Sequence, residues 1–291
     1  MPLHATSPKS DANLVACSET DTHGYYRTGH WLRAKHQQTG YDSGRRFERW
    51  ALELVPIAPG WRILDAGCGW GRFTWSLIDD ALVPAEHIVC CDLSEGMLRT
   101  AEEEARRRQQ RVEFRVRNIE ALPLRARSVD LAIAGHVLYH LGDIDRGVRE
   151  LARVIKDDGW VLVTTNSDAI DPLVIDLHER ALAALDIAFL PEAPSRFSME
   201  NGLDYLTRSF NIVETHHFTD NITFPDVQSF VDLYTTIGHF RAVMEDQAVP
   251  LEKRRRLAAE VREQASRLLE TTGILRTDVL MGAFVCREPN R

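Results

Sequence analysis

Short apolar runs alternate with amphipathic stretches between Trp61 and Asn166. This alternation predicts a parallel sheet whose two faces are covered by helices. The expected strands cover residues 61–66, 87–92, 112–117, 129–134 and 160–165. All except 112–117 are largely continuous apolar runs, as expected for strands buried on both faces. The expected helices cover residues 70–81, 95–109, with Ser94 as the N-cap, and 144–155, which is ended by Asp157-Asp158-Gly159.

Two later apolar runs, at residues 210–218 and 279–287, complete the sheet, and roughly sixty residues of helical pattern lie between them. The expected fold class is therefore α/β: a doubly wound, mostly parallel, seven-stranded, Rossmann-like sheet with a helical cap inserted after the fifth and sixth strands. The expected domain organisation is a disordered N-terminus at 1–24, a helical lead-in or lid at 25–55, an α/β core at 56–168 and a helical cap at 169–208 and 221–276.

Aromatic residues are concentrated in the expected cap region. Nine of them lie between Phe189 and Phe240. Two interpretations stay open, a second small hydrophobic core and an aromatic lining over a ligand cleft, and each is compatible with the other.

Composition and charge narrow the class of partner. The 35 Lys and Arg residues against 43 Asp and Glu residues give a net charge of −8, which argues against nucleic acid and favours a small molecule. The chain has no apolar run long enough to span a membrane, and its first 24 residues are polar, so we expect a cytoplasmic protein without a membrane partner. The five cysteines lack the spacing of zinc ligands and are expected to be free thiols.

A glycine-rich turn follows the first expected strand, in the segment ILDAGCGWGRF at residues 63–73. Such a turn lets the backbone approach a ligand at the carboxyl edge of a sheet. A dinucleotide fingerprint would need glycine or alanine at the position of Arg72, whose bulk opposes close helix packing around a pyrophosphate. Gly67, Gly69 and Gly71 form GxGxG instead. Asp92 ends the next strand, where a carboxylate can accept both hydroxyls of a ribose.

Five segments resemble, in order and spacing, the class I S-adenosylmethionine-dependent methyltransferases, most closely those that act on small molecules. They are ILDAGCGWGRF, CDLSEGML, RNIEALPL, SVDLAIAGHVLYHLGD and LARVIKDDGWVLVTT. The resemblance covers roughly residues 45–168 and implies S-adenosylmethionine as the cofactor.

The resemblance also implies a role for each matching residue at the cofactor's amino-acid end. Asp65, with the backbone of Gly67 and Gly69 and the neighbouring Gly71, is expected to face the methionine ammonium and carboxylate. Gly135 and His136 follow the fourth strand, where the methyl group is expected to meet the acceptor.

At the nucleoside end, the resemblance implies that Asp92 clamps the ribose and that Leu93 and Met97 pack against the adenine. The family commonly has Asp where this chain has Asn118. We expect the amide oxygen of Asn118 to accept from the adenine amino group and the backbone N–H of Ile119 to meet a ring nitrogen.

The candidate catalytic residues follow the fourth strand. His140 is the first candidate for a general base, and His136 and Tyr139 are the others, because an alcohol must lose its proton as the methyl group arrives. An equally good interpretation is that His140 is structural and either caps a helix or hydrogen-bonds a backbone carbonyl. Asp168 is a candidate either to orient the imidazole or to cap the next helix. His136 and His140 have a spacing that can hold a metal, but without a matching third ligand no metal site is expected.

The function expected from these residues and the resemblance is methyl transfer from S-adenosylmethionine to an oxygen or nitrogen of a small, partly apolar metabolite. We expect this reaction to belong to specialised (natural-product) metabolism. One alternative is a nicotinamide-dependent oxidoreductase, which Arg72 disfavours. Another is a non-catalytic, cofactor-binding regulatory module. The sequence does not fix the oligomeric state, and a homodimer is left open.

Overall fold

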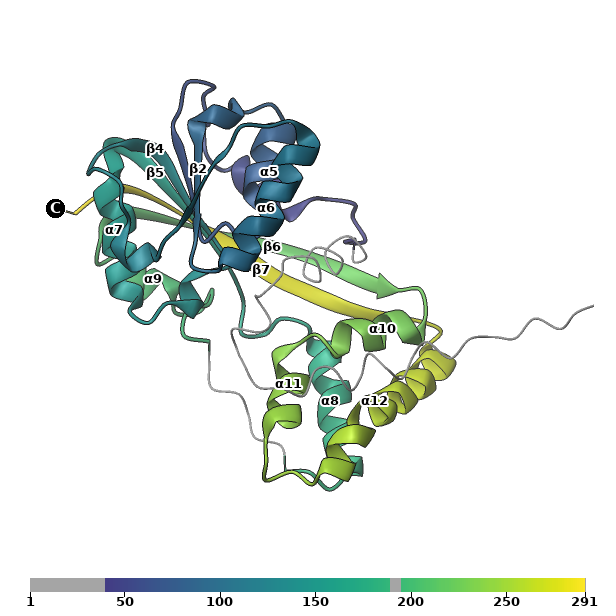
Figure 1. The fold of residues 1–291 in the computed structure, drawn as a ribbon. Helices are drawn as coiled ribbons and strands as arrows, with labels where there is room; N and C mark the ends of the chain where they lie inside the picture. The colour runs from purple at the N-terminus through teal and green to yellow at the C-terminus, as the bar shows by residue number, and fades with distance from the viewer. Residues whose placement is uncertain (1–39, 189–194, 291) are drawn as a thin grey trace, which may run out of the picture.

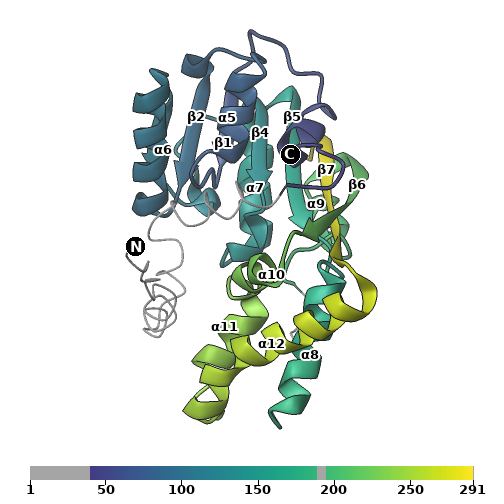
Figure 2. The ribbon, with the colours of Figure 1, turned by 90° about the vertical axis from the view of Figure 1, so that its right-hand side faces the viewer.

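A seven-stranded sheet forms the centre of the computed structural model, which describes residues 40–188 and 195–290 (Figures 1 and 2). The strands are β1 (Ile63–Ala66), β2 (Ile88–Asp92), β3 (Glu113–Val116), β4 (Val129–Gly135), β5 (Ile155–Asn166), β6 (Phe210–Phe224) and β7 (Leu275–Pro289). Their order is β3-β2-β1-β4-β5-β7-β6. The pairs among β1 to β5 are parallel, whereas β7 is antiparallel to β5 and to β6. The expected fold class is confirmed.

Both faces of the central strands are buried, as their apolar runs predict. All four residues of β1 are buried. Leu64 packs in the hydrophobic cluster with Leu151 of α7 (Ile144–Val154), while Ile63 packs in the opposite cluster with Phe73 of α5 (Arg72–Asp79). β3 lies at the edge of the sheet and keeps no fully buried residue, which explains why its sequence is not a continuous apolar run.

Two helical boundaries show how local signals compare with the structure. α6 (Glu95–Arg108) begins as expected, because Ser94 Oγ accepts from the Met97 backbone N–H at 3.2 Å. The expected stop at Asp157-Asp158-Gly159 is wrong: α7 already ends at Val154, and these three residues lie inside β5. Ile155 pairs with Val129 and Trp160 with Leu131, so the three residues form an irregularity within the strand, where the register shifts, and do not end the helix.

The last two strands extend beyond the rest of the sheet as a two-stranded ribbon. β7 pairs with β5 from Met281 onward, whereas residues 275–280 pair only with residues 219–224 of β6. The ribbon reaches the helical cap, where Phe224 and Leu275 are part of the cap's hydrophobic core (Figure 1). The cap helices are α8 (Pro172–Ala184), α10 (Val227–Tyr234), α11 (Gly238–Glu245) and α12 (Leu251–Thr272).

α9 (Gly202–Leu206), inside the segment expected to belong to the cap, packs instead on the sheet. A Cβ at Gly202 would lie 2.7 Å from the ring of Phe284 on β7, so glycine allows this close approach. The expectations for residues 1–24 and 25–39 lie outside the described residues. The rest of the lead-in contains α4 (Phe47–Leu52).

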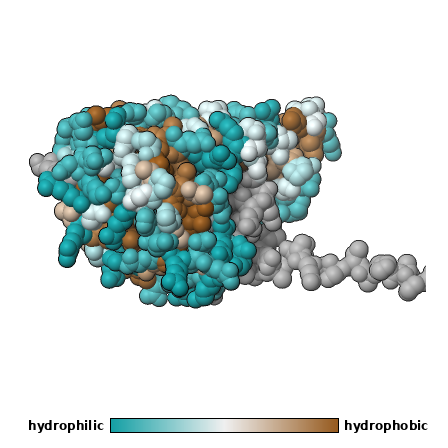
Figure 3. All heavy atoms as spheres, turned by 90° about the horizontal axis from the view of Figure 1, so that it is seen from above, coloured by the Kyte–Doolittle hydropathy of each residue, from teal (hydrophilic) through white to brown (hydrophobic). Residues whose placement is uncertain are grey.

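The surface seen from above is mainly hydrophilic, with hydrophobic residues grouped near the middle of that face (Figure 3). Among the described residues, no helix combines the length and the apolar character that crossing a membrane requires.

Candidate functional site

The glycine turn lies where β1 meets β2, at the carboxyl edge of the parallel strands. Gly67 donates its backbone N–H to the carbonyl of Cys91 at 2.7 Å, and Gly71 is the N-cap of α5. Gly67, Gly69 and Gly71 all have positive φ, the left-handed region that favours glycine. A Cβ on Gly67 would also lie 2.3 Å from Cγ2 of Val137, so both conformation and space require glycine there.

Asp65 is buried beneath this turn, with 1% of its surface exposed. Its Oδ2 accepts from the hydroxyl of Thr74 at 2.6 Å and from the Thr74 backbone N–H at 3.2 Å. Burial raises the pKa of Asp65 to about 6, against the opposing effect of the Thr74 hydrogen bonds. A cation beside this carboxylate would favour its ionised form.

Asp92 connects the end of β2 to the glycine turn. Its Oδ2 accepts from the Gly69 backbone N–H and its Oδ1 from the Ser94 backbone N–H, both at 2.8 Å. Burial raises the pKa of Asp92, while these hydrogen bonds oppose the shift. Leu93, directly after it, is 67% exposed, whereas Met97 is buried. An exposed apolar side chain, that of Leu93, therefore adjoins the carboxylate.

Asn118 uses its side chain locally. Its Oδ1 accepts from the Glu120 backbone N–H at 2.9 Å and caps the 3₁₀ helix Ile119–Ala121. The side chain of Ile119 is buried in the core. Asn118 thus orders the backbone around Ile119, whose N–H is expected to meet an adenine ring nitrogen.

His136 sits in a strained and enclosed position after β4. It has φ of +51°, unusual for a residue other than glycine, and its ring lies 5.2 Å from that of Phe47 on α4. Its Nε2 is buried and has no hydrogen-bond partner among the described residues. Burial, and then the charge of Arg72, lower the pKa of His136 to about 3. The preceding residue, Gly135, lies against the ring of Phe73. A Cβ on Gly135 would lie 2.4 Å from that ring.

Tyr139 and His140 lie in the 3₁₀ helix Leu138–His140, with ring centroids 4.4 Å apart. The residue His140 is exposed to solvent. Partial desolvation lowers the pKa of His140, and the charge of Arg241 lowers it further. Arg241 belongs to α11, so a charge on the cap acts on this histidine.

The other candidates lie apart from this group. Asp168 accepts from the Ser195 backbone N–H at 3.1 Å and from the Ser198 hydroxyl at 3.2 Å, so it orders the chain after the cap's first helix and neither orients an imidazole nor caps α8. Within residues 40–188 and 195–290, no cluster of three or more His, Cys, Asp or Glu side chains is placed to hold a metal ion.

The lead-in supplies site residues that the sequence did not single out. Glu48 on α4 forms an ion pair with Arg72, the first residue of α5, while the neighbouring Phe47 covers His136. The only sequence signal was Arg72 itself, at the position where a dinucleotide fingerprint needs a small residue.

The part of the chain that carries this site is similar in sequence to known proteins. Residues 64–163 match the family model described as "Methyltransferase domain". The chain is 32% identical over 151 residues to the probable S-adenosylmethionine-dependent methyltransferase Rv3030 of Mycobacterium tuberculosis, covering 50% of this chain and 52% of that protein. It is 29% identical over 178 residues to the malonyl-[acyl-carrier protein] O-methyltransferase of Geobacter sulfurreducens, covering 61% and 66%. The chain thus spans about half the length of the first of these relatives.

Solved structures share the fold. The [4+2]-cyclase SpnF superposes with a TM-score of 0.56 at 19% identity, covering 92% of this chain and 95% of that one. At this identity, the likeness concerns the fold alone.

Proposed function

We propose that this chain, which belongs to the class I S-adenosylmethionine-dependent methyltransferases, transfers the methyl group of S-adenosylmethionine to an oxygen or nitrogen of a small, partly apolar metabolite. The observation that carries the proposal is the arrangement at the carboxyl edge of the sheet. There the glycine turn lies against Asp92 and against Val137, between the two histidines after β4, and the charge of Arg241 on α11 acts on His140.

The chain's own residues fit the cofactor. The buried Asp65 carboxylate suits the methionine ammonium, and the open glycine turn offers backbone groups to its carboxylate. Asp92 has acceptor capacity for the ribose hydroxyls, with exposed Leu93 beside it for the adenine. When bound, S-adenosylmethionine supplies a methyl group on a sulfonium, and the protein's main task is to align an acceptor with it in a cleft that excludes water.

His140 is the better general base of the two histidines. The pKa of His136 is lowered to about 3, so at neutral pH it takes up a proton poorly. The ring of Phe47 also packs against that of His136, with centroids 5.2 Å apart. His140 is exposed, so an acceptor can reach it, and it would accept the proton of an alcohol. Tyr139 beside it would contact the acceptor.

An oxygen acceptor is favoured by one relative, because the Geobacter sulfurreducens protein is an O-methyltransferase by name. The net charge of −8 favours a small molecule over nucleic acid. A biosynthetic role in the cytoplasm is part of the same proposal.

Two measurements on the purified chain test the proposal. S-adenosylhomocysteine should raise the melting temperature, and NAD should leave it unchanged; the reverse would support the oxidoreductase alternative. Radiolabelled methyl groups from S-adenosylmethionine should then appear in members of a panel of small phenols, alcohols, carboxylic acids and amines, and not in bulk tRNA. Label in tRNA would contradict the small-molecule proposal. Cofactor binding without transfer to any acceptor would favour the regulatory module.

A further inference from the structure

The buried carboxylate of Asp65 receives both of its hydrogen bonds on one oxygen. Oδ2 accepts from the Thr74 hydroxyl at 2.6 Å and from the Thr74 backbone N–H at 3.2 Å. None of the described residues donates a hydrogen bond to Oδ1. The two oxygens therefore differ: Oδ2 is engaged by α5, whereas Oδ1 keeps its full acceptor capacity.

The start of α5 explains why Thr74 can donate twice. Thr74 is the third residue of this helix, and N–H groups in the first turn have no partner within the helix. The N-cap, Gly71, has no side chain that could accept from this N–H. Asp65 thus takes the place of a capping side chain, and its negative charge lies at the positive end of the helix dipole.

Cys90 on β2 fixes the direction of the Thr74 hydroxyl. A distance of 2.6 Å is typical of a hydroxyl that donates to an ionised carboxylate, so the single hydroxyl proton is directed at Asp65. Thr74 Oγ1 also lies 3.1 Å from Cys90 Sγ, and in this contact the thiol must be the donor. Cys90 and Asp65 are register partners in the sheet, which brings both side chains to the same face. The donors therefore run in one direction, from Cys90 to Thr74 to Asp65.

Asp65 is the group in this chain of bonds whose charge changes near neutral pH. Burial raises the pKa of Asp65 to about 6, the Thr74 hydrogen bonds oppose this shift, and the charge of Asp92 adds to it. The nearby thiols of Cys68 and Cys91 stay neutral. Burial raises the pKa of Cys91 to about 12, and hydrogen bonding to the neighbouring thiol, together with burial, raises the pKa of Cys68.

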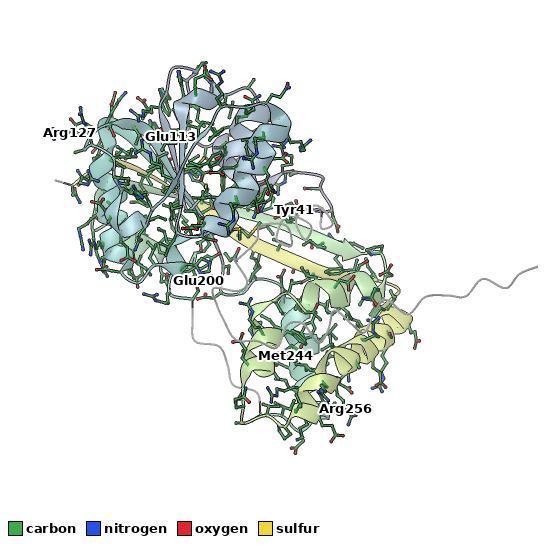
Figure 4. All side chains as sticks on the ribbon, in the orientation of Figure 1. Tyr41, Glu113, Arg127, Glu200, Met244 and Arg256 are labelled. Atoms are coloured by element: carbon green, nitrogen blue, oxygen red, sulfur yellow. The ribbon has the colours of Figure 1, made fainter. Side chains whose placement is uncertain are left out.

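Water cannot replace the Thr74 hydroxyl, because the bond lies inside the protein. Asp65 is 1% exposed and Thr74 is 0% exposed. The strand of Asp65, β1, is an interior strand between β2 and β4, and the edge strand β3, which begins at Glu113 (labelled in Figure 4), lies beyond β2. Without this hydroxyl the carboxylate would lose a charge-assisted hydrogen bond in a place closed to solvent.

We propose that Thr74, oriented by Cys90, is a positioning residue for cofactor binding: it holds Oδ2 of Asp65 so that the carboxylate stays ionised and presents Oδ1 to the methionine ammonium. This inference rests on the proposed function, in which Asp65 faces that ammonium. Its consequence is a cofactor affinity that depends on pH. Below about pH 6 a proton neutralises Asp65, so the affinity should fall by at most about 10-fold per pH unit.

Calorimetry with S-adenosylhomocysteine, between about pH 5 and pH 8.5, measures this dependence. Thr74→Val has nearly the same shape but no hydroxyl, so the fall in affinity should begin roughly one to two pH units higher than in the wild type. Near the upper end of the range the two Kd values should converge, because Asp65 is then ionised in both proteins. Thr74→Ser restores the hydroxyl and should restore the wild-type profile.

Two further variants separate this role from a general effect on the core. Thr100→Val is the matched control, because Thr100 is a buried threonine on α6 whose hydroxyl donates to the carbonyl of Gly96 at 3.2 Å, and the profile should stay in place. Cys90→Ala removes the donor that orients Thr74, so the profile should move in the same direction by a smaller amount.

The carboxyl carbon signal of Asp65 in the ¹³C-labelled chain without cofactor is a second readout, independent of binding. It is identified as the signal lost in Asp65→Asn. It should titrate near pH 6 in the wild type and at higher pH in Thr74→Val.

The outcomes distinguish this inference from the proposed function. A wild-type chain that does not bind S-adenosylhomocysteine at any pH would contradict the proposed function and this inference with it. Wild-type binding with an unmoved profile in Thr74→Val, or an Asp65 signal that titrates at the same pH in both proteins, would overturn the role of Thr74 alone. A Thr74→Val protein that binds more weakly by one constant factor at every pH would also overturn it, by showing a merely structural threonine.

Discussion

The backbone N–H of Gly69 donates to Oδ2 of Asp92 at 2.8 Å, so one carboxylate ties the glycine turn to the end of the neighbouring strand. Its Oδ1 is held in turn by the N–H of Ser94. Each carboxylate oxygen has two lone-pair sites, and the group therefore keeps acceptor capacity after both backbone bonds are made. Asp92 can position the turn and bind ribose hydroxyls at once.

Replacing Asp92 should accordingly weaken cofactor binding. Asp92→Ala removes the charged acceptor, and we expect calorimetry with S-adenosylhomocysteine to show a loss of about 1.5 to 3 kcal/mol, roughly 10- to 150-fold in Kd. Asp92→Asn should retain an acceptor for Gly69 and lose less. The control is Asp157→Ala, because the Asp157 side chain is 71% exposed and lies on β5 away from the turn. An unchanged Kd in Asp92→Ala would refute the ribose assignment.

Alanine substitutions at two glycines of the turn should separate the free-energy cost of backbone strain from that of steric overlap. Gly67 and Gly69 both have positive φ, but a Cβ on Gly67 would collide with Val137 at 2.3 Å, whereas one on Gly69 would meet nothing within 4 Å. We expect Gly69→Ala to lower the free energy of unfolding by about 1 to 2 kcal/mol from strain alone. Gly67→Ala should cost about 1 to 3 kcal/mol more through overpacking. Urea unfolding measures both, and equal losses would show that Val137 moves aside freely.

The fold was largely predictable because its signals are local. Ile63 to Ala66 read as a buried strand and are buried on both faces, and Ser94 caps α6 as its residue type suggests. The turn signal at Asp157-Asp158-Gly159 failed for a non-local reason. Ile155 pairs with Val129 and Trp160 pairs with Leu131 of β4, so the three residues bulge between these pairs within the strand, and Lys156 pairs with Asp130 at 2.6 Å.

The surroundings of the candidate site could not be predicted, because its contacts join residues far apart in the chain. The ring of His136 meets Phe47, and the charge of Arg241 acts on His140. Neither contact has a signature within a window of neighbouring residues. The sequence could nominate the histidines from their place after a strand, but only the packing separates the enclosed His136 from the more open His140.

The stability of the cap should depend on pH through His178. This buried histidine on α8 lies with its Nδ1 2.7 Å from the hydroxyl of Tyr234, and burial lowers its pKa from 6.5 to about 4. Between these two pH values the unfolded chain takes up a proton that the folded cap excludes. The stability from neutral His178 is therefore fully present above pH 6.5 and is lost as the pH falls toward 4.

His178→Gln should flatten this dependence. Gln keeps a hydrogen-bond partner for Tyr234 but does not titrate, so the slope of unfolding free energy against pH should decrease by at most about 1.4 kcal/mol per pH unit between pH 6.5 and 4. Urea unfolding followed by circular dichroism measures the slope. His217→Gln, at an exposed histidine on β6, is the matched control and should leave the slope unchanged. An unchanged slope in His178→Gln would mean that the cap admits the proton.

The most direct test of the proposed chemistry concerns His140. If an alcohol is the acceptor, a neutral imidazole must take its proton, and general-base catalysis contributes roughly 10² to 10⁴ in rate. His140→Ala should lower kcat by such a factor, while the Kd for S-adenosylhomocysteine stays unchanged because His140 is not among the residues proposed to hold the cofactor. The wild-type rate should fall on the acid side of neutrality, below the ordinary histidine pKa of about 6.5, since desolvation and Arg241 lower the pKa of His140.

Arg241→Gln then distinguishes a catalytic His140 from a structural one. Removing the nearby positive charge should raise the pKa of His140, so the acid limb of the rate profile should move to higher pH. Arg255→Gln, at an exposed position on α12, should leave the limb in place. A structural histidine would give no such movement. Full kcat in a folded His140→Ala protein would instead indicate an acceptor amine that is already neutral and needs only alignment with the methyl group.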